Sequence, residues 1–450
     1  MKTQTRRQFI KTAAAASALG AASIAAPFVR TAHSAGRLKV GLWDHWVPGA
    51  NDVSLKIIQD WARANGIEVS VDYITSAGGK IALTAQAEAR AGVGHDIYVM
   101  PLWMTAIHQD SLEPVDDVVN DLIREFGPTT PDVEYLGKLD GTWYSVPGPI
   151  GSPTFPFVSR LDYFSEIAGI DLRKVFPVDE RRDPRLVEAW NYENFLDHAR
   201  KLHDAGHPFG AAIAVTPDAG SWLGPLFTAF GSVMIDAEDN IVVDSDETRD
   251  TLDYVSRLTQ FMPEQIYAWD DASNNRWIIS GRGSAILNPP SAWAVAKRDR
   301  PEVAAQLWHH DTLRGPKGRF RGSVPFMTGI WKFSEQKSAA KDLLRHLCRR
   351  EQVFQFITAS RGYDTPLHPS FADHNIWQEI SPPKGGQYNY PVRGDEQLVL
   401  IGYPARPAIA AQISAQGVIP NLVARVTQGK ESFDDAIAWA ENEMEGFMRG

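Results

Sequence analysis

Apolar and polar positions alternate with two different periods early in the chain. Every second residue is apolar over 38–42, which predicts a strand, and apolar residues then recur at helical spacing over 53–61. A strand is also predicted over 67–74, an alanine-rich helix from 78 to about 91, and a buried strand over 96–100. Elements in this order form parallel sheets with right-handed crossovers. Ligands bind such sheets beyond the carboxyl ends of the strands.

A segment rich in proline and glycine interrupts the alternation at residues 140–159. Asp140 and Gly141 are typical of a two-residue hairpin turn because both residue types take positive φ readily, and a strand over 143–146 should follow. Residues 147–156 contain four prolines and two glycines. Because proline lacks the N–H that a sheet requires, we predict an extended segment that bends at a few points rather than a sheet interior. We interpret it as a hinge between two lobes.

The second half of the chain continues with helical and strand patterns. Helices are predicted over 192–205, after Trp222, and over 246–261, with strands over 210–215 and 240–244. Residues 323–356 should cross back to the first lobe and include a helical part from 337. The last helices are predicted over 408–428 and 434–447.

Composition restricts the class of protein. A chain of 450 residues with 44% hydrophobic and 22% charged residues is globular and too long for one ordinary core. Beyond the N-terminal region, no window approaches the roughly 20 apolar residues of a spanning helix. Cys348 is the single cysteine, so the chain can form no internal disulfide and lacks the cysteine that anchors lipoproteins.

Residues 1–35 have the order of an export signal. Arg6 and Arg7 precede a mildly apolar, alanine-rich run over 12–27, and Ala32 to Ala35 offers small residues for cleavage. The segment resembles a twin-arginine signal peptide, which implies the twin-arginine translocase as a partner during export and a periplasmic location. The alternative is an amphipathic basic N-terminus of a cytosolic protein. Removing the five basic leader residues changes the formal net charge from −10 to −15. This charge argues against nucleic acid or an anionic membrane as the main partner.

Short motifs in a fixed order identify a family resemblance. They are the first strand ending in Trp43, Gly94–Ile97, Leu112–Val115, Asp140–Pro147, Gly281–Trp293 and Gly322–Ile330. Each is weak alone, but their collinear order covers nearly the whole mature chain. The sequence is similar to the family 1 extracellular solute-binding proteins of ABC importers, the sugar-type group that includes maltose-binding proteins.

The resemblance implies a fold and a function. The expected fold is the α/β, periplasmic-binding-protein-like (type II) fold, with two α/β lobes joined by a multi-strand hinge. Residues 36–150 and 323–356 would form the N-terminal lobe, and 151–322 and 357–450 the C-terminal lobe. Such a receptor is a monomer that closes on a solute, most often a sugar, and delivers it to the permease subunits of an ABC importer. It needs no cofactor.

Tryptophans near predicted loops are candidate ligand platforms. Sugars present apolar C–H faces together with hydroxyls, so their sites combine aromatic rings with polar side chains. Of the 14 tryptophans, we select Trp43, Trp103, Trp222 and Trp293. A core position is the alternative for each. Asp44 and His45 would hydrogen-bond hydroxyls, although Asp44 could instead cap the following turn.

Further candidates follow from the family alignment. Ser152 and Thr154 stand on the crossing segment where maltose-binding proteins carry an acidic residue. Asn288 matches the family pattern beside Trp293, but Ser291 replaces the first tryptophan of the family's pair, which suggests a smaller or differently shaped ligand. Tyr403 and Arg406 align with a ligand loop. Contact by Arg406 would indicate an acidic or phosphorylated sugar, and a solvated or salt-bridged surface residue is the alternative.

Catalytic and metal motifs are absent from the sequence, so no catalytic residue and no metal ligand is predicted. His309, His310 and Asp311 could bind a transition metal, but an exposed polar turn is the favoured interpretation. A solute-binding receptor is the leading function. A secreted carbohydrate-active enzyme is the alternative, and a structural or adhesive wall protein is the third possibility.

Overall fold

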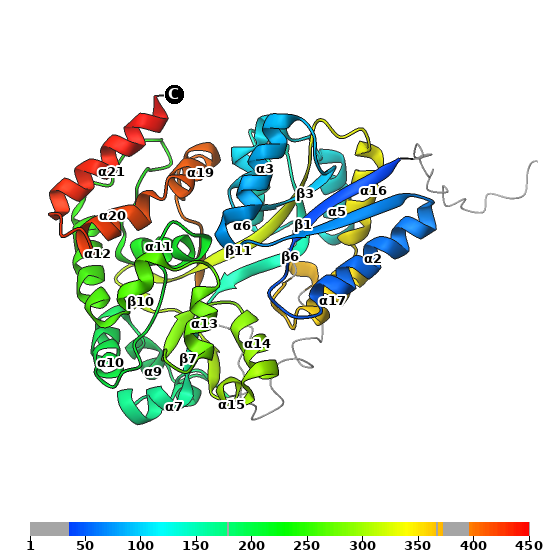
Figure 1. Ribbon diagram of the computed structural model, residues 1–450. Coiled ribbons are helices and arrows are strands. Elements are labelled where there is room, and N and C mark those ends of the chain that lie inside the picture. The colour runs from blue at the N-terminus through cyan, green and yellow to red at the C-terminus, as the bar shows by residue number, and fades with distance from the viewer. Residues whose placement is uncertain (1–35, 178–179, 366–367, 372–395, 450) are drawn as a thin grey trace, which may run out of the picture. The chain divides into compact units, whose positions relative to one another are not determined.

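The computed structural model of the protein describes residues 36–177, 180–365, 368–371 and 396–449 (Figure 1). The predicted leader, residues 1–35, lies outside the described residues. Within the described ranges, every helix is too short or too polar to cross a lipid bilayer.

Three parallel strands form one side of the first sheet. β1 (Arg37–Trp43) pairs in parallel with β2 (Glu68–Ile74) and with β3 (Ile97–Pro101), in the order β2-β1-β3. The connections contain α2 (Ala50–Asn65) and α3 (Lys80–Ala91). The predicted alternation of parallel strands and crossover helices is therefore confirmed.

Glycines set both ends of α2. The helix begins after Gly49 and ends at Gly66, whose φ angles are 88° and 67°. The N–H of Gly66 donates to two carbonyls of the last turn, which satisfies groups that a helix end leaves without partners. The buried side of α2 packs against α16 (Lys337–Leu347) and α17 (Arg350–Ala359), which lie beside it in Figure 1. These helices cover one face of the first sheet.

Two long strands lead from the first sheet toward the second. β6 (Val146–Phe155) and β11 (Gly318–Ile330) pair antiparallel with each other, and β11 also pairs with β3. The proline-rich segment is therefore a strand of the seven-stranded sheet, which corrects the prediction that it avoids sheet pairing. Its pairing with β11 shifts register twice, and such irregularities accommodate residues that lack a backbone donor. Two of the predicted lobe boundaries, at residues 150 and 322, fall inside these two strands, the third, at residue 356, falls inside α17, and all three stay a prediction.

Gly151 permits the close approach of β6 and β11. Its φ is 96°, and a Cβ atom at this position would lie 2.4 Å from the backbone nitrogen of Phe326. Both observations require glycine. Beyond Pro156 the chain enters β7 (Phe157–Arg160), so the segment passes from one sheet to the other as predicted.

The second sheet is small and antiparallel. β7 lies between β8 (Ala285–Leu287) and β9 (Leu307–His310). The helices α10 (Tyr192–Asp204) and α12 (Asp246–Leu258) confirm two of the predicted helices.

Two predicted strands of this half are wrong. Residues 210–215 form irregular chain whose N–H groups bond outside any ladder, as Gly210 N does to Ala285 O at 3.0 Å. Residues 240–244 contribute one isolated bridge, between Ile235 and Ile241. Several of their apolar residues, such as Ile213 and Val243, are buried without strand pairing, and alternation alone cannot distinguish this arrangement from a strand.

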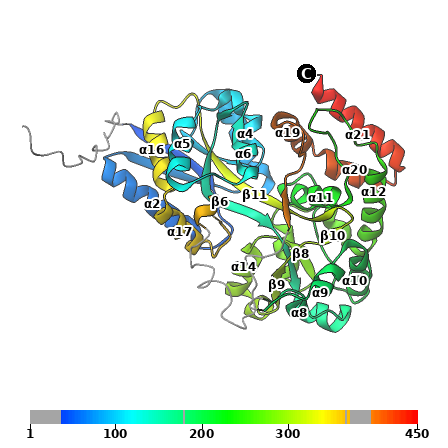
Figure 2. The same cartoon turned by 180° about the vertical axis from the view of Figure 1, so that it is seen from behind.

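The C-terminal helices pack on the second half of the chain, as Figure 2 shows from behind. The helix predicted over 408–428 is two helices, α19 (Pro407–Ala415) and α20 (Val418–Thr427). Gly417 separates them with a φ of 62°. α20 contacts α21 (Phe433–Met448) as well as α12, so the last helices belong to the same packed unit.

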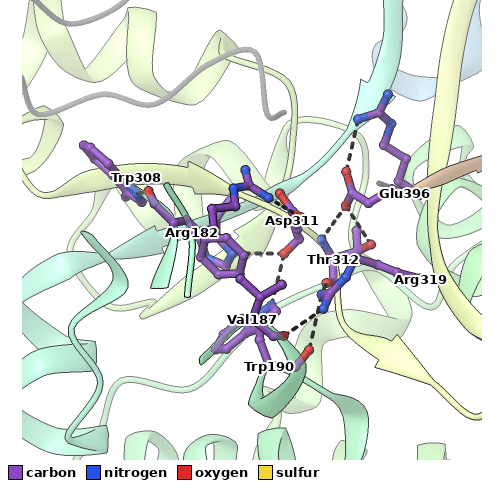
Figure 3. A network of polar contacts seen from close by, with 11 residues as sticks. Arg182, Val187, Trp190, Trp308, Asp311, Thr312, Arg319 and Glu396 are labelled. Carbon is purple, nitrogen blue, oxygen red and sulfur yellow. Dashed lines mark hydrogen bonds and ion pairs between the residues drawn. The ribbon is translucent and has the colours of Figure 1, made fainter. Parts of the chain in front are cut away.

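A buried polar network connects the residues that follow β9 with segments that precede and follow residues 372–395 in the sequence (Figure 3). Arg182 Nη1 donates to Asp311 Oδ2 at 2.7 Å, and Arg321 Nη1 donates to Glu396 Oε2 at 3.1 Å. Glu396 Oε1 also accepts from the backbone N–H of Thr312 at 2.6 Å. Burial, followed by the nearby charge of Asp311, raises the pKa of Glu396. The network holds the segment that begins at Glu396 against the second sheet.

The interpretation of residues 309–311 as an exposed turn is wrong. His309 and His310 end β9, and with Asp311 all three have no exposed surface. The ring of His310 stacks 4.9 Å from that of Phe176, and burial lowers the pKa of His310 to about 3. Among the described residues, no group of three potential ligands is arranged to hold a metal ion. These polar residues are part of the core.

Candidate functional site

A cavity of about 590 Å³ lies where the loops after β1 and β3 meet α11 (Pro217–Phe230), β11 and α19. Its lining is aromatic and hydroxylic, with acidic groups. The six aromatic lining residues are Trp43, Trp46, Trp103, Trp269, Phe326 and Tyr363. The eight polar ones are Ser76, Thr216, Asp218, Ser221, Asp270, Asp271, Ser323 and Ser414. The described lining contains no lysine, arginine or histidine.

Two tryptophans follow the carboxyl ends of parallel strands, where the sequence predicted ligand contacts. Trp43 packs edge-on against Phe326, with ring centroids 4.6 Å apart, and lies 5.4 Å from Tyr363. Trp103 packs edge-on against Tyr135 at 5.4 Å. Both tryptophans are 2% exposed, and both indole N–H groups lack an acceptor among the described residues. The cavity wall therefore holds two donors that the described fold does not use.

The backbone beside Trp103 is held in an uncommon conformation. Leu102 has a φ of 50°, in the left-handed region that bulky residues seldom enter. Its N–H donates to Pro325 O at 3.2 Å, so β11 helps to hold this residue. Such conformations persist where the surrounding structure determines them, and they concentrate at functional sites.

His45 supports this wall from behind. Its Nδ1 accepts from the N–H of Val47 at 2.9 Å, so the proton lies on Nε2, which is 3.1 Å from Asp364 Oδ2. Asp364 Oδ1 accepts from Gly151 N at 2.6 Å. Asp364 thereby ties the loop after β1 to β6. His45 is absent from the cavity lining, which does not support its predicted role as a direct ligand contact.

The facing wall comes from α11 and from the loop that precedes α13 (Ser273–Ile279). Thr216 caps α11, because its Oγ1 accepts from Ala219 N at 3.1 Å, and this cap places Asp218 in the first turn. Asp218 Oδ2 accepts from Asn274 Nδ2 at 2.7 Å. Asp271 Oδ1 is buried and has no hydrogen-bond partner among the described residues.

The three lining aspartates differ in electrostatics. Burial, followed by the charge of Asp271, raises the pKa of Asp218 well above its ordinary value. Burial also raises the pKa of Asp271 to about 6. Burial acts in the same direction on Asp270, but hydrogen bonds from Ser273 and Arg276 outweigh it and lower the pKa of Asp270. Burial therefore disfavours the charged form of both Asp218 and Asp271, whereas Asp270 stays charged through its hydrogen bonds.

The remaining predicted residues lie outside the lining. Trp222 is inside α11, 5% exposed, and its indole N–H donates to Ala212 O at 2.7 Å, so it is a core residue. Trp293 is buried in a second apolar cluster, with Lys297 Nζ 4.7 Å from its ring. Asn288 Nδ2 donates to Asn275 Oδ1 at 2.6 Å. These side chains are buried or hydrogen-bonded within the protein, which does not support direct contact with a ligand.

Two charged candidates on loops, Asp44 and Arg406, also lie outside the lining. The exposed Asp44 accepts a hydrogen bond from the side-chain Nδ2 of Asn51 at 2.7 Å and does not line the cavity. Arg406 Nε pairs with Asp239 at 2.5 Å, the surface salt bridge that was its alternative.

Tyr403 is 55% exposed and packs edge-on against Tyr135, 5.4 Å away. Thr154 is buried in β6, and the backbone of Ser152 pairs with that of Val324. Tyr403 and Thr154 are absent from the lining of the described cavity.

Sequence reasoning missed most of the facing wall. Asp218, Trp269 and Asp271 lie in segments without a recognised strand end. Two local signals could have indicated them: the Thr216–Pro217 helix start, and an aromatic residue followed by two acids at 269–271. Tyr363 lies in a loop that the sequence analysis had not linked to ligand binding.

Solved structures with known ligands share this fold. Maltose-bound MalE3 of T. maritima superposes with a TM-score of 0.72 and 19% identity, covering 91% of this chain and 100% of that one. A solute-binding protein of Thermotoga lettingae TMO with α-D-tagatose gives 0.71 and 16%, covering 92% and 99%. One from Agrobacterium radiobacter K84 with ribitol gives 0.70 and 15%, covering 93% and 100%. The chain therefore has the two-lobe, type II fold that was predicted.

No curated protein sequence matches this chain. A family model, in contrast, assigns the chain directly. The model described as "Bacterial extracellular solute-binding protein" matches residues 56–381, which is more than half of the sequence. The family and the solved structures named above consist of binding proteins rather than enzymes. The chain belongs to the bacterial extracellular solute-binding protein family.

Proposed function

We propose that the protein is a periplasmic receptor that captures a carbohydrate or polyol in the cavity and delivers it to an ABC importer. The observation that carries this proposal is the lining: six aromatic residues surround a space of about 590 Å³ together with eight hydroxyl or carboxyl residues. This volume falls in the range of roughly 300–1,000 Å³ for small-molecule sites. The ligands named for the three related structures are a sugar, a sugar and a polyol.

The lining matches the chemistry of a sugar. Aromatic faces pack on C–H groups, while the carboxylates accept hydrogen bonds from hydroxyls. The indole N–H groups of Trp43 and Trp103 are donors that a hydroxyl oxygen could satisfy. Trp46 is half-buried and lines the cavity, so its ring is the accessible platform.

The acidic pair raises the alternative of a carbohydrate-active enzyme. Glycoside hydrolysis requires two carboxyl groups that flank the scissile bond. Asp218 and Asp271 are neighbours on one wall, close enough for the charge of Asp271 to raise the pKa of Asp218. This arrangement favours binding without turnover, and the ligand should be recovered unchanged.

Export and docking complete the proposal. We infer that residues 1–35 direct the protein through the twin-arginine translocase, and that the permease subunits of an importer receive the loaded receptor. Replacing Arg6 and Arg7 together by lysine should leave the precursor inside the cell. Normal export of this variant would refute the twin-arginine route and leave the binding function untouched.

A thermal-shift screen of the mature protein against sugars and polyols tests the function. A ligand at a hundredfold excess over its Kd stabilises the folded state by about 2.7 kcal/mol. Trp46→Ala should weaken binding of that ligand about tenfold or more, because a stacking face is lost.

Trp293→Phe is the matched control, because Trp293 lies outside the cavity lining. This variant should bind the ligand with unchanged affinity. Conversion of the ligand by the purified protein would replace the receptor by the enzyme. Equal affinities in the Trp46 variant and the wild type would place the site elsewhere.

A further inference from the structure

The cavity carries negative charge without a counter-charge. Three of its described lining residues are aspartates, and none is a lysine, arginine or histidine. Asp270 is balanced from outside the cavity, because Arg276 Nη2 donates to its Oδ1 at 2.7 Å and Ser273 Oγ does so at 2.6 Å. Asp218 and Asp271 form no ion pair with a cation of the described residues. The uncompensated charge therefore belongs to this pair.

The hydrogen bonds of the pair are also incomplete. The uncharged amide of Asn274 donates to Asp218 at 2.7 Å and also reaches Leu287 O at 3.2 Å, so its two donors are shared. Asp271 Oδ1 is buried and accepts no hydrogen bond from the described residues. A buried carboxylate oxygen without a donor is costly, and the fold retains it at the edge of an open cavity. What is missing on this wall is a donor that carries positive charge.

One aromatic residue of the cavity lining belongs to the same segment as Asp271. Trp269 immediately precedes the acidic loop, is 8% exposed and lines the cavity. An ammonium group is attracted both by carboxylates and by the face of an indole ring. A neutral hydroxyl could donate a hydrogen bond to Asp271. It would not change the unfavourable pairing with Asp218, in which either both carboxyl groups are charged or one of them is protonated. A cation removes this conflict.

The opposite wall has the complementary polarity. The N–H groups of Trp43 and Trp103 are donors without acceptors among the described residues, so they suit hydroxyl oxygens of the ligand. The cavity thus presents donors on one wall and carboxylates on the other. A ligand that fits both would have hydroxyls at one end and an amine at the other.

We propose that the ligand is a carbohydrate that carries a protonated amine, with the ammonium group placed between Asp218 and Asp271. This inference rests on the proposed function, because it specifies the chemistry of the solute in the same cavity. It predicts that the receptor distinguishes an amino sugar from the neutral sugar of the same ring, and that Asp271 determines this specificity.

Matched pairs of sugars provide the test. Thermal shift and then calorimetry at pH 7.5 would compare D-glucosamine with D-glucose, D-galactosamine with D-galactose, and the glucosamine β-1,4 disaccharide with cellobiose. N-acetylglucosamine and N-acetylgalactosamine serve as uncharged controls that keep the nitrogen. At least one amino sugar should bind 30-fold or more tightly than the neutral sugar of its pair. Where the acetylated form is among the controls, the amino sugar should exceed it by the same factor. Stronger binding of a neutral partner in every pair that binds overturns the inference and leaves the proposed function intact.

Variants separate charge recognition from folding. Asp271→Asn should reduce the affinity for the amine by about 10- to 100-fold. Its affinity for the neutral partner should change by less than about threefold, because the shape of the side chain is kept. Asp253→Asn removes the same charge from α12, outside the cavity lining, and should change neither affinity.

Equal losses for the amine and its neutral partner would assign Asp271 a structural role and overturn the inference. If no sugar, amino sugar or polyol stabilises the protein, the proposed function falls together with the inference.

Discussion

Replacing Asp271 by asparagine should make the stability of the unliganded protein less sensitive to pH. The pKa of Asp271 rises from an ordinary value of 3.8 to about 6 in the folded protein, mainly through burial. The folded state therefore binds more protons than the unfolded state between these values, and stability falls as pH rises through this window. The loss is complete above the folded pKa.

The shift sets the size of the effect. A shift of one pKa unit corresponds to about 1.4 kcal/mol, so the rise from 3.8 to about 6 corresponds to about 3 kcal/mol. Asparagine cannot ionise and does not suffer this loss. The unfolding free energy of the variant minus that of the wild type should therefore be about 3 kcal/mol larger at pH 8 than at pH 4. For a chain of this size, that change corresponds to a melting temperature about 3 °C higher.

The measurement is a double difference. Urea and thermal unfolding of wild type and variant at pH 4 and pH 8 remove the contributions of all other titrating groups. Asp270→Asn is the matched control, because the pKa of Asp270 is lowered and its charge is bonded by Ser273 and Arg276. That variant should lose stability at pH 8 and to nearly the same extent at pH 4, because the contribution of a carboxylate with a lowered pKa is lost only as pH falls below the ordinary value of 3.8. Parallel pH profiles for Asp271→Asn and the wild type, or a gain in stability from Asp270→Asn at pH 8, would refute the electrostatic account of this wall.

Three further predictions concern the rest of the fold. Gly151→Ala should cost about 3 kcal/mol or more in urea unfolding, because its Cβ would lie 2.4 Å from a backbone atom at positive φ. Gly446→Ala, in open space on α21, should instead be neutral or stabilise by up to about 1 kcal/mol, and equal effects would contradict the steric argument. Arg321→Met should lower the unfolding free energy by about 3 kcal/mol at pH 7 and by less at pH 5, because Glu396, with its raised pKa, takes up a proton when its partner is lost. Equal losses at both pH values would show that the ion pair matters less than packing. Cys348 should react with a thiol reagent in urea and not in buffer, because it is buried and its pKa is raised to about 12; rapid labelling of the native protein would contradict its position.

Local chemistry determined the elements that the sequence predicted well. The hairpin at Asp140 and Gly141 forms because both residues take positive φ, of 50° and 82°. α2 ends at Gly66 for the same reason. The alternation of strands and helices predicts that β1, β2 and β3 are parallel, and this arrangement brings the loops that carry Trp43 and Trp103 to one edge of the sheet. These features depend on near neighbours in the chain, so a single sequence was sufficient to predict them.

Tertiary packing decided which polar and aromatic residues face the cavity. Trp103 and Trp222 were equal candidates by sequence, yet one lines the cavity and the other is enclosed within α11 and the core. Asp218 and Asp271 are 53 positions apart and gain their shared electrostatics from a contact that no local period encodes. The burial of His310 likewise depends on aromatic neighbours from other strands and loops. The periodic position of a side chain specifies the side of a helix or strand on which it lies. Its solvation depends on segments that the fold brings from elsewhere in the chain, and solvation in turn sets its pKa and its access to a ligand.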